Sequence, residues 1–424
     1  MRRPAISSTS FQPEDDAAAV GTRPGGGTFA AFSVPQYPRL WAIGLLWNLG
    51  RWMSIFLCSY LVNQLTHSPF LVQIVGAAFF APMFLGGAIG GVISDRLDRR
   101  RTLLAMIALL VPASVIMAAV NLSGSVEVWM VYPYMLAIGL GMVVDMTSRR
   151  ALMYDLVGPA NVTNALALEA LAMTSGTLLG GLAGGTLISL LGIGQAFVLV
   201  SAFYVVSLIV LLGVRTAGVR TRVGERPRIL QDLGATFAHV RNNATLVSIL
   251  GVTIVMNAFY FSFTPMVPVF AEHLDVNAFW TGVLAGAPAL GSMGGTLLIA
   301  RGMGPRRGRA YVGGSVVALV FLCVFAAASW YPVALLALVL AGVGTSGFAT
   351  MQSALVMTTA SDEMRGRALG LLSMCIGVLP FAMLTLGGLA QAVGPSAGVV
   401  SAAVVGLAMM AAWTHRRPES HRLA

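Results

Sequence analysis

Two ionisable residues stand inside long apolar segments, and they carry the clearest chemistry in the sequence. Arg51 lies about 17 Å along an apolar segment at 40–65, and Glu169 lies about 9–12 Å along another at 163–191. Burial favours the protonated form of a carboxyl group, whereas a nearby guanidinium favours the ionised form, so the two together suit proton loading and release. We predict that Glu169 carries a proton. We expect Arg51, at a compatible depth, to pair with it and modulate it, or to bind an anionic group of a ligand; a static structural ion pair is the alternative.

Polar side chains recur at helical spacing in four of the apolar segments, which places each set on one helix face. The sets are Asn48, Arg51, Ser59 and Asn63; Thr253, Asn257, Tyr260 and Thr264; Ser346, Thr350 and Ser353; and Tyr134, Gly141 and Asp145. Hydrogen-bonded helix packing would explain the Ser and Thr positions equally well. We expect a substrate and proton pathway lined by Asn48, Asn257, Tyr260, Thr264 and Thr350, with the aromatic run at 258–265 adding an apolar wall.

The composition places these residues in a membrane protein. The chain has 424 residues, of which 57% are hydrophobic and only 10% are charged. A soluble domain usually carries about 25% charged residues. All 26 basic residues are arginine. Without lysine the chain can form neither a Gly-Lys-Ser/Thr phosphate loop nor a Schiff base, which excludes an ATP-driven pump within this chain. The three cysteines lie far apart in apolar runs and form no zinc or disulfide pattern.

Twelve segments are long and apolar enough to cross a bilayer, which takes about 20 residues. They lie at 40–65, 70–94, 102–122, 126–147, 163–191, 194–213, 244–269, 279–300, 310–329, 332–357, 368–391 and 396–413. Every arginine except Arg51 falls on the side shared by the two termini, and the positive-inside rule makes that side cytoplasmic. The net charge of +10 therefore indicates membrane orientation and no nucleic-acid partner. We expect an all-α integral membrane protein with twelve transmembrane helices and both termini cytoplasmic.

An internal repeat divides the chain into two six-helix bundles. The stretch at 151–168 aligns without a gap with the stretch at 354–371, and Gly90-Gly91 faces Gly294-Gly295 at nearly the same offset. Because both matches are rich in apolar residues, chance similarity is the alternative. We expect a flexible cytoplasmic tail at 1–38, bundles at 39–214 and 244–413, a basic cytoplasmic linker at 215–243 and a short tail at 414–424.

The stretch at 90–101, Gly-Gly-Val-Ile-Ser-Asp-Arg-Leu-Asp-Arg-Arg-Arg, resembles the signature between the second and third helices of the major facilitator superfamily. Gly91, Asp95, Arg96, Arg99 and Arg100 match, and Asp98 replaces the usual glycine. The resemblance implies a gate in which Asp95 meets the start of the eleventh helix, near 365–368, and in which helices one, four, seven and ten line the cavity. We expect Arg96, Arg99 or Arg100 to pair with Asp145 and to release it when the protein opens inward.

A glycine pattern at 176–185 is similar to the antiporter signature of that superfamily's exporters. Gly176, Gly180, Gly184 and Gly185 match it, and Gly181 replaces its proline. Ordinary small-residue helix packing is the alternative. The stretches at 148–168 and 362–371 resemble the drug:proton antiporter-type subfamily that contains macrolide efflux pumps and siderophore exporters, over roughly 40–413 of this chain.

These features predict a transporter in the cell membrane and no enzyme. We expect proton-coupled efflux of a hydrophobic or amphipathic small molecule, such as a drug, an antibiotic, a secondary metabolite or a siderophore, by alternating access. The proton gradient would supply the energy, with no cofactor and no metal. The expected partners are the lipid bilayer and the substrate, with the protein a monomer. The alternatives are an importer of a sugar or organic acid, and a membrane receptor or assembly protein that transports nothing.

Overall fold

The computed structural model describes residues 29–96, 98–214, 243–301, 307–359 and 365–417, and this part of the chain contains helices and no strand. The first half comprises η1 (Ala30–Ser33), α1 (Tyr37–Thr66), α2 (Pro69–Arg96), α3 (Arg99–Leu122), α4 (Val128–Val144), the π-helical turn η2 (Asp145–Arg149), α5 (Arg150–Leu191) and α6 (Ile193–Leu212). The second half comprises α8 (Ala244–Phe259), η3 (Phe261–Met266), α9 (Val267–His273), α10 (Ala278–Ala300), α11 (Arg307–Ala327), α12 (Tyr331–Thr359), α13 (Arg365–Ile376), α14 (Leu379–Val393) and α15 (Pro395–Arg416).

Ten helical segments within the described ranges are long and apolar enough to cross a membrane. One of them runs through Val128–Leu191 and contains two of the predicted segments, those at 126–147 and 163–191. Another predicted segment, 70–94, falls on α2, whose residues Pro69–Phe84 are apolar within the part of that helix whose side chains are described. The structure therefore supports a multi-pass, all-helical membrane protein, while the count of twelve crossings and the side on which the termini lie stay predictions.

The link between α4 and α5 is helical, where the sequence predicted a loop. A helix of 64 residues would span about 96 Å if straight, roughly three times the hydrocarbon thickness of a bilayer. The helix bends instead at Gly158, whose φ is 66°, a left-handed conformation that glycine adopts without steric cost. Pro159 follows and has no backbone N–H to continue the hydrogen-bond ladder.

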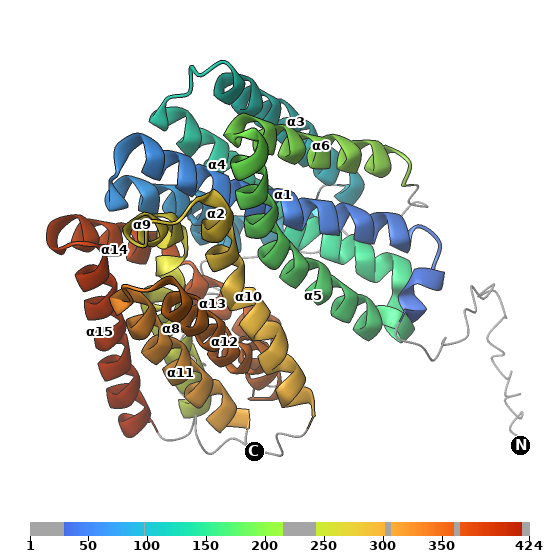
Figure 1. The fold of residues 1–424 in the computed structure, drawn as a ribbon. Coiled ribbons are helices and arrows are strands. Elements are labelled where there is room, and N and C mark those ends of the chain that lie inside the picture. Colours follow the sequence, from blue (N-terminus) through green and yellow to red (C-terminus); the bar gives the residue numbers. More distant parts are fainter. Residues whose placement is uncertain (1–28, 97, 215–242, 302–306, 360–364, 418–424) are drawn as a thin grey trace, which may run out of the picture.

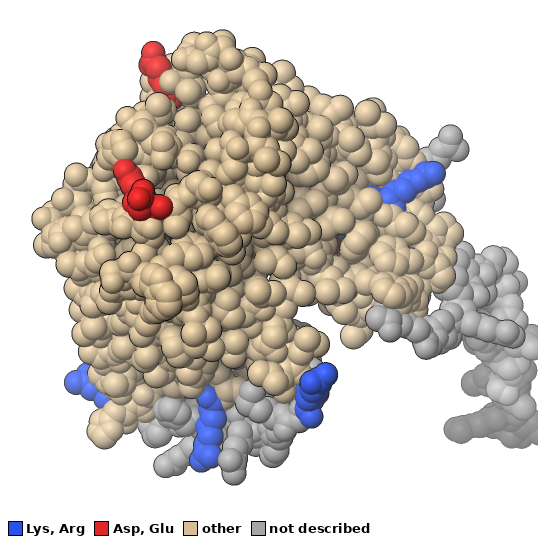
Figure 2. Space-filling model, viewed as in Figure 1, with Lys and Arg blue, Asp and Glu red and all other residues tan. Residues whose placement is uncertain are grey.

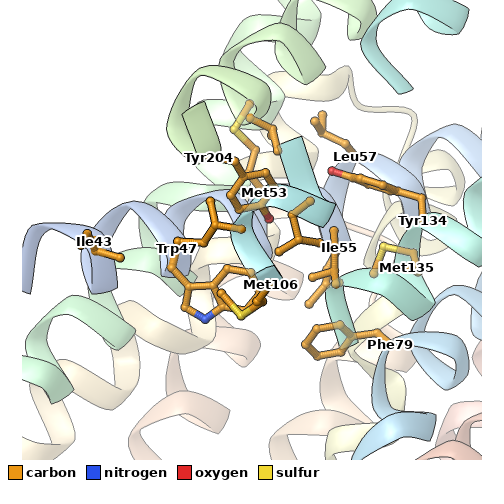
Figure 3. Close-up of a cluster of buried hydrophobic side chains, with 14 of the residues drawn as sticks. Ile43, Trp47, Met53, Ile55, Leu57, Phe79, Met106, Tyr134, Met135 and Tyr204 are labelled. Atoms are coloured by element: carbon orange, nitrogen blue, oxygen red, sulfur yellow. The ribbon is translucent and has the colours of Figure 1, made fainter. Parts of the chain in front are cut away.

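Buried apolar side chains form two large clusters, one in each half of the chain. Apart from Val269, the first cluster comes from residues 31–214, and the second comes from residues 246–410. The two halves appear as two lobes in Figure 1, with α1–α6 in one and α8–α15 in the other. Figure 3 shows part of the first cluster, where Trp47 of α1 and Tyr204 of α6 pack with ring centroids 5.9 Å apart. Because lipid tails are as apolar as these side chains, close packing holds such a bundle together.

Glycines let α5 approach helices of both lobes. A Cβ at Gly176 would lie 2.8 Å from a backbone atom of Asn48, and one at Gly180 would lie 2.8 Å from the backbone nitrogen of Met53, both on α1. Gly184 likewise packs on α1, at Phe56. A Cβ at Gly185 would instead lie 3.0 Å from the Cα of Gly282 on α10, in the other lobe. All four predicted glycines thus serve close helix packing, and their antiporter role stays a prediction.

The lobes meet through α5 against α10 and through α2 against α14. Glu272 at the end of α9 accepts a hydrogen bond from Asn63 of α1 (2.7 Å) and contacts the Nδ1 atom of His67, which caps α1 (2.6 Å). Ser68 adds a 2.8 Å hydrogen bond to Gln391 of α14. In Figure 2 the acidic side chains lie at one end, and the surface between the lobes is hollowed toward the arginine-bearing ends. The described hydrogen bonds of Glu272 and Gln391 therefore join the lobes at the acidic end.

Candidate functional site

A cavity of about 390 Å³ lies between the two lobes, and none of the described residues that line it is charged. Its lining from α1 and α5 is Trp52, Ile55, Phe56, Ser59, Ala170, Met173, Thr174, Thr177 and Gly181. Its lining from the second half is Tyr260, Phe261, Phe263, Thr264, Val267, Pro268, Ala285, Pro288, Ala289, Ser292, Thr345 and Ala349. The mostly apolar wall, contributed by both lobes, is that of a site for a small organic molecule.

The structure places some of the predicted lining residues at this cavity and others elsewhere. Tyr260 and Thr264 belong to the wall. Asn48 and Asn257 are buried and donate to carbonyls one turn back on their own helices, those of Gly44 and Thr253, at 2.8 Å in each case. The side-chain amides of Asn48 and Asn257 thus bind the backbone of their own helices, and neither residue belongs to the cavity wall. Thr350 is exposed on α12, next to the lining residue Ala349.

A buried group of charges lies beside the cavity in the first lobe, centred on Arg149. The Arg149 guanidinium donates to the carboxylate of Glu169 on α5 (Nη1 to Oε2, 2.6 Å) and to that of Asp145 (Nη2 to Oδ2, 2.9 Å). Both carboxylates make a second contact with the same guanidinium. The π-helical turn that spans Asp145–Arg149 sets this arrangement, and such turns often occur at functional sites. Glycine at position 44 leaves room for it, since a Cβ there would lie 3.0 Å from the guanidinium carbon.

The predicted pairing of Arg51 with Glu169 is wrong in this structure, because Glu169 is bound by Arg149. Arg51 donates to Asn48 Oδ1 at 2.6 Å. Its guanidinium carbon lies 5.9 Å from the ring centroid of Trp47 and 5.3 Å from that of Trp52. Depth along a helix indicated a compatible level in the membrane but could not fix the direction in which each side chain points.

Arg51 is buried beside the cavity and does not belong to its wall. It is 4% exposed, and within the described ranges it forms no ion pair with a carboxylate and its Nε atom has no hydrogen-bond partner. Trp52 touches both the cavity and the guanidinium of Arg51. The positive charge of Arg51 therefore lies behind the cavity wall, in contact with the indole ring of Trp52.

Two arginines of the predicted gate, Arg99 and Arg100, have other partners than the expected Asp145. Arg99 pairs with Asp155 near the start of α5. Arg100 donates to the backbone carbonyls of Val214 (2.7 Å) and Leu212 (3.0 Å). Asp145, expected to pair with one of these loop arginines, is engaged by Arg149 instead, because it lies four residues earlier on the same helical stretch.

The rest of the predicted gate is described only in part. Gly91, Asp95 and Arg96 lie at the end of α2, where only the backbone is described, so their predicted contacts fall outside the described side chains, as does the start of α13. Asp98 has an ordinary negative φ of −59° and caps α3 by accepting a 2.7 Å hydrogen bond from the backbone N–H of Arg101. An aspartate at this position is therefore explained by helix capping and needs no left-handed turn.

Arg149 was not predicted as a site residue from the sequence, where it counted only among the arginines that orient the chain in the membrane. The signal was present, because Asp145 and Arg149 stand four residues apart on a helix and such pairs meet. Trp52, Thr174 and Thr177 were likewise not predicted as cavity residues. In the part of the chain that the structure describes, no group of three His, Cys, Asp or Glu side chains could hold a metal ion.

Comparison with known proteins places the fold. A bacterial homolog to the human lysosomal transporter Spinster is 15% identical, with a TM-score of 0.70 over 93% of this chain and 98% of its own. The nucleoside transporter NupG is 14% identical, with a TM-score of 0.69 over 90% and 98%. A POT family transporter in complex with 5-aminolevulinic acid is 11% identical, with a TM-score of 0.72 over 92% and 100%. At these identities the likeness shows the fold alone.

Sequence comparison places the family. No curated protein sequence matches this chain. A family model described as transmembrane secretion effector matches residues 26–422, which is nearly the whole length. Together with the lobed helical fold and its central apolar cavity, this match shows that the chain belongs to the transmembrane secretion effector family of the major facilitator superfamily and is a multi-pass membrane transporter.

Proposed function

We propose that this transporter exports a hydrophobic or amphipathic small molecule from the cytoplasm across the cell membrane and is driven by the proton gradient. The cavity between the lobes supports this most strongly, because an uncharged, largely apolar wall suits such a molecule. An importer of an organic acid would need a charged group at its ligand, and an importer of a sugar would need a wall that is mostly polar. A receptor that transports nothing would bind ligand yet move none across a membrane.

We take the protein to be open toward the arginine-bearing ends, and the hollow between the lobes in Figure 2 supports this. Glu272 and Gln391 close the opposite end by binding residues of the first lobe. Since the positive-inside rule makes the arginine side cytoplasmic, this is an inward-facing state that receives substrate from the cytoplasm. Export then requires the lobes to rock about the cavity so that the Glu272 end parts and the arginine ends meet.

The charges around Arg149 support a proton site at Glu169. Arg51, Arg149, Asp145 and Glu169 balance when both carboxylates are ionised. A proton on Glu169 would leave this buried group with one net positive charge. Asp145 would keep Arg149 paired while Glu169 is protonated. A group that both loads and releases a proton is what coupled export needs.

Replacement of Glu169 by glutamine tests the coupling. Efflux of a fluorescent amphipathic dye from preloaded cells is measured with and without an uncoupler. We expect the native protein to lose most of its efflux when the uncoupler is added, and Glu169→Gln to show only the uncoupled rate, since the amide cannot exchange a proton in this way. The control is Glu127→Gln, an exposed carboxylate whose described side-chain hydrogen bond is with Trp129 in its own lobe. Normal coupled efflux by Glu169→Gln would rule out the proton role.

A further inference from the structure

The helical segment Ala244–His273 changes form beside the cavity. The helix α8 ends at Phe259, the 3-10 helix η3 follows, and α9 continues from Val267. In a 3-10 helix each backbone carbonyl accepts a hydrogen bond from the N–H three residues later, so residue 265 would serve Ser262. Residue 265 is a proline, which has no N–H. The carbonyl of Ser262 therefore lacks the donor that a 3-10 helix would otherwise give it.

Gln73 on α2, in the other lobe, donates to this carbonyl. Its Nε2 atom lies 2.9 Å from the backbone oxygen of Ser262. Both residues are 0% exposed, so this hydrogen bond joins the lobes away from water. The contacts of Glu272, in contrast, involve partly exposed side chains. A buried backbone carbonyl needs a partner inside the protein, because bulk water does not replace a lost one.

Close packing holds the side chain of Gln73 in this position. A Cβ atom added at Gly387 of α14 would lie 2.9 Å from the Cβ atom of Gln73. One turn later on α2, Ala77 belongs to a buried cluster with Leu379 and Met383 of α14. The helix α2 thus lies against both η3 and α14, and Gln73 stands in the contact between the lobes.

The same segment, η3, also forms part of the cavity wall. Residues three apart share one face of a 3-10 helix. Ser262 and Pro265 share the face toward α2, where a Cβ atom added at Gly76 would lie 2.5 Å from the Cγ atom of Pro265. Phe261 and Thr264 share another face and line the cavity. A movement of η3 at the cavity therefore reaches the hydrogen bond of Gln73 directly.

We propose, on the basis of the alternating access proposed above, that Gln73 is a positioning residue that holds the acidic end closed. It does so by binding the carbonyl of Ser262, which Pro265 leaves without a donor. The bond exists only while α2 lies against η3, so it stabilises the closed state relative to the open one. When the lobes part at this end, water reaches both groups and replaces the bond. Opening of the acidic end and release of the cavity wall formed by η3 are then one event.

Chemical labelling of a buried cysteine tests this role. Ala77→Cys places a thiol in the buried contact between the lobes, and a water-soluble maleimide reacts with it only while this contact is open. The labelling rate of the full chain in phosphatidylcholine nanodiscs therefore follows the open population. Labelling of the three native cysteines is measured on the chain without Ala77→Cys and is subtracted.

Gln73→Met keeps the length of the side chain and removes its donor. We expect it to raise the labelling rate about tenfold, the effect of one lost buried hydrogen bond. Gln73→Asn, whose amide ends one methylene group short of the carbonyl, should also raise the rate and provides the test if Gln73→Met does not fold. In chains that carry Pro265→Ala, Gln73→Met should raise the rate less than about threefold, because the alanine N–H can donate to Ser262.

Two controls separate opening of the lobes from a general loosening of the structure. Gln352→Met removes an amide that donates within the second lobe, to the hydroxyl of Thr253 at 3.1 Å, and should leave the labelling rate of Ala77→Cys unchanged. Ala196→Cys places a thiol at a buried position within the first lobe. That thiol should label no faster in Gln73→Met than in the chain with native Gln73.

An unchanged labelling rate in both Gln73 variants, an equal increase at Ala196→Cys, or an increase of the same size in chains with Pro265→Ala would overturn the proposal. Labelling requires no transport. The expected rates in a protein that moves no dye out of cells would therefore reject the exporter function and leave the role of Gln73 standing.

Discussion

At the scale of single residues, the buried charges are held by one arginine that serves two carboxylates. Arg149, Asp145 and Glu169 are each less than 9% exposed, and the guanidinium contacts each of the two carboxylates through two of its nitrogens. Removing charges from water is costly, and only close, well-aligned partners offset that cost. The stability of this buried ion group therefore depends on Arg149, which both carboxylates share.

Replacement of Arg149 by methionine should destabilise the protein strongly. Two carboxylates would remain buried without their partner, and breaking a buried pair costs about 3–5 kcal/mol. We expect a clear drop in the thermal unfolding temperature of the purified protein. Arg150→Met is a matched control, because Arg150 is the next residue and is exposed. If both variants unfolded at the native temperature, the buried ion group would contribute nothing to stability.

Sequence reasoning at this scale identified types of residue better than partners. It selected Glu169 and Arg51 because charges within apolar segments are rare, and both are indeed buried. It could not foresee the π-helical turn that brings Arg149 to Glu169, since one extra residue in a turn leaves no mark in the pattern of apolar residues. The partners of buried polar groups are likewise visible only when the neighbouring helices are in place.

At the scale of helices, α5 carries two glycine faces that serve different contacts. Gly176, Gly180 and Gly184 recur every four residues and lie against α1 of the same lobe. Gly181 and Gly185 lie against α10 of the other lobe, where Gly282 approaches in return. The first face fixes α5 within its bundle. The second brings two helix backbones of opposite lobes close together, in the place where rocking motions must slide or pivot.

Replacement of Gly185 by alanine should separate these effects from ordinary helix propensity. The added methyl group would meet the backbone of α10, and overpacking usually costs about 1–3 kcal/mol. We expect a lower unfolding temperature and slower dye efflux. Gly388→Ala, on α14, is the control, because its added methyl group would meet nothing within 4 Å. That control should be neutral or stabilising, since alanine favours a helix by up to about 1 kcal/mol. Native stability and efflux in Gly185→Ala would show that the contact between α5 and α10 tolerates a methyl group.

At the scale of the whole molecule, the repeat, the apolar segments and the one-sided arginines predicted a membrane transporter of two bundles, and the family and the helical fold agree on a membrane transporter. Hydropathy carries this information because every crossing must be apolar. It does not tell which helices meet between the bundles, because α5, α10, α2 and α14 are as apolar as the others. The joining of the lobes at the acidic end involves a few polar contacts that no periodic pattern reveals.

The closure at Glu272 should decide how often the acidic end opens. Glu272 binds Asn63 and His67 across the lobes, but the side chains of Glu272 and His67 are partly exposed, at 39% and 65%. Partly exposed pairs contribute about 0–1 kcal/mol, so their loss should shift the balance of states by up to about fivefold. We expect Glu272→Gln to lengthen spin-label distances measured between Leu65 and Trp280, two exposed positions on opposite lobes, each replaced by a labelled cysteine. Glu127→Gln should leave that distance distribution unchanged, because the hydrogen bond that the described structure gives the Glu127 side chain lies within its own lobe. An unchanged distribution in Glu272→Gln would assign the closure to the packing of α5 on α10 and of α2 on α14, so that the polar contacts only mark where the lobes already meet.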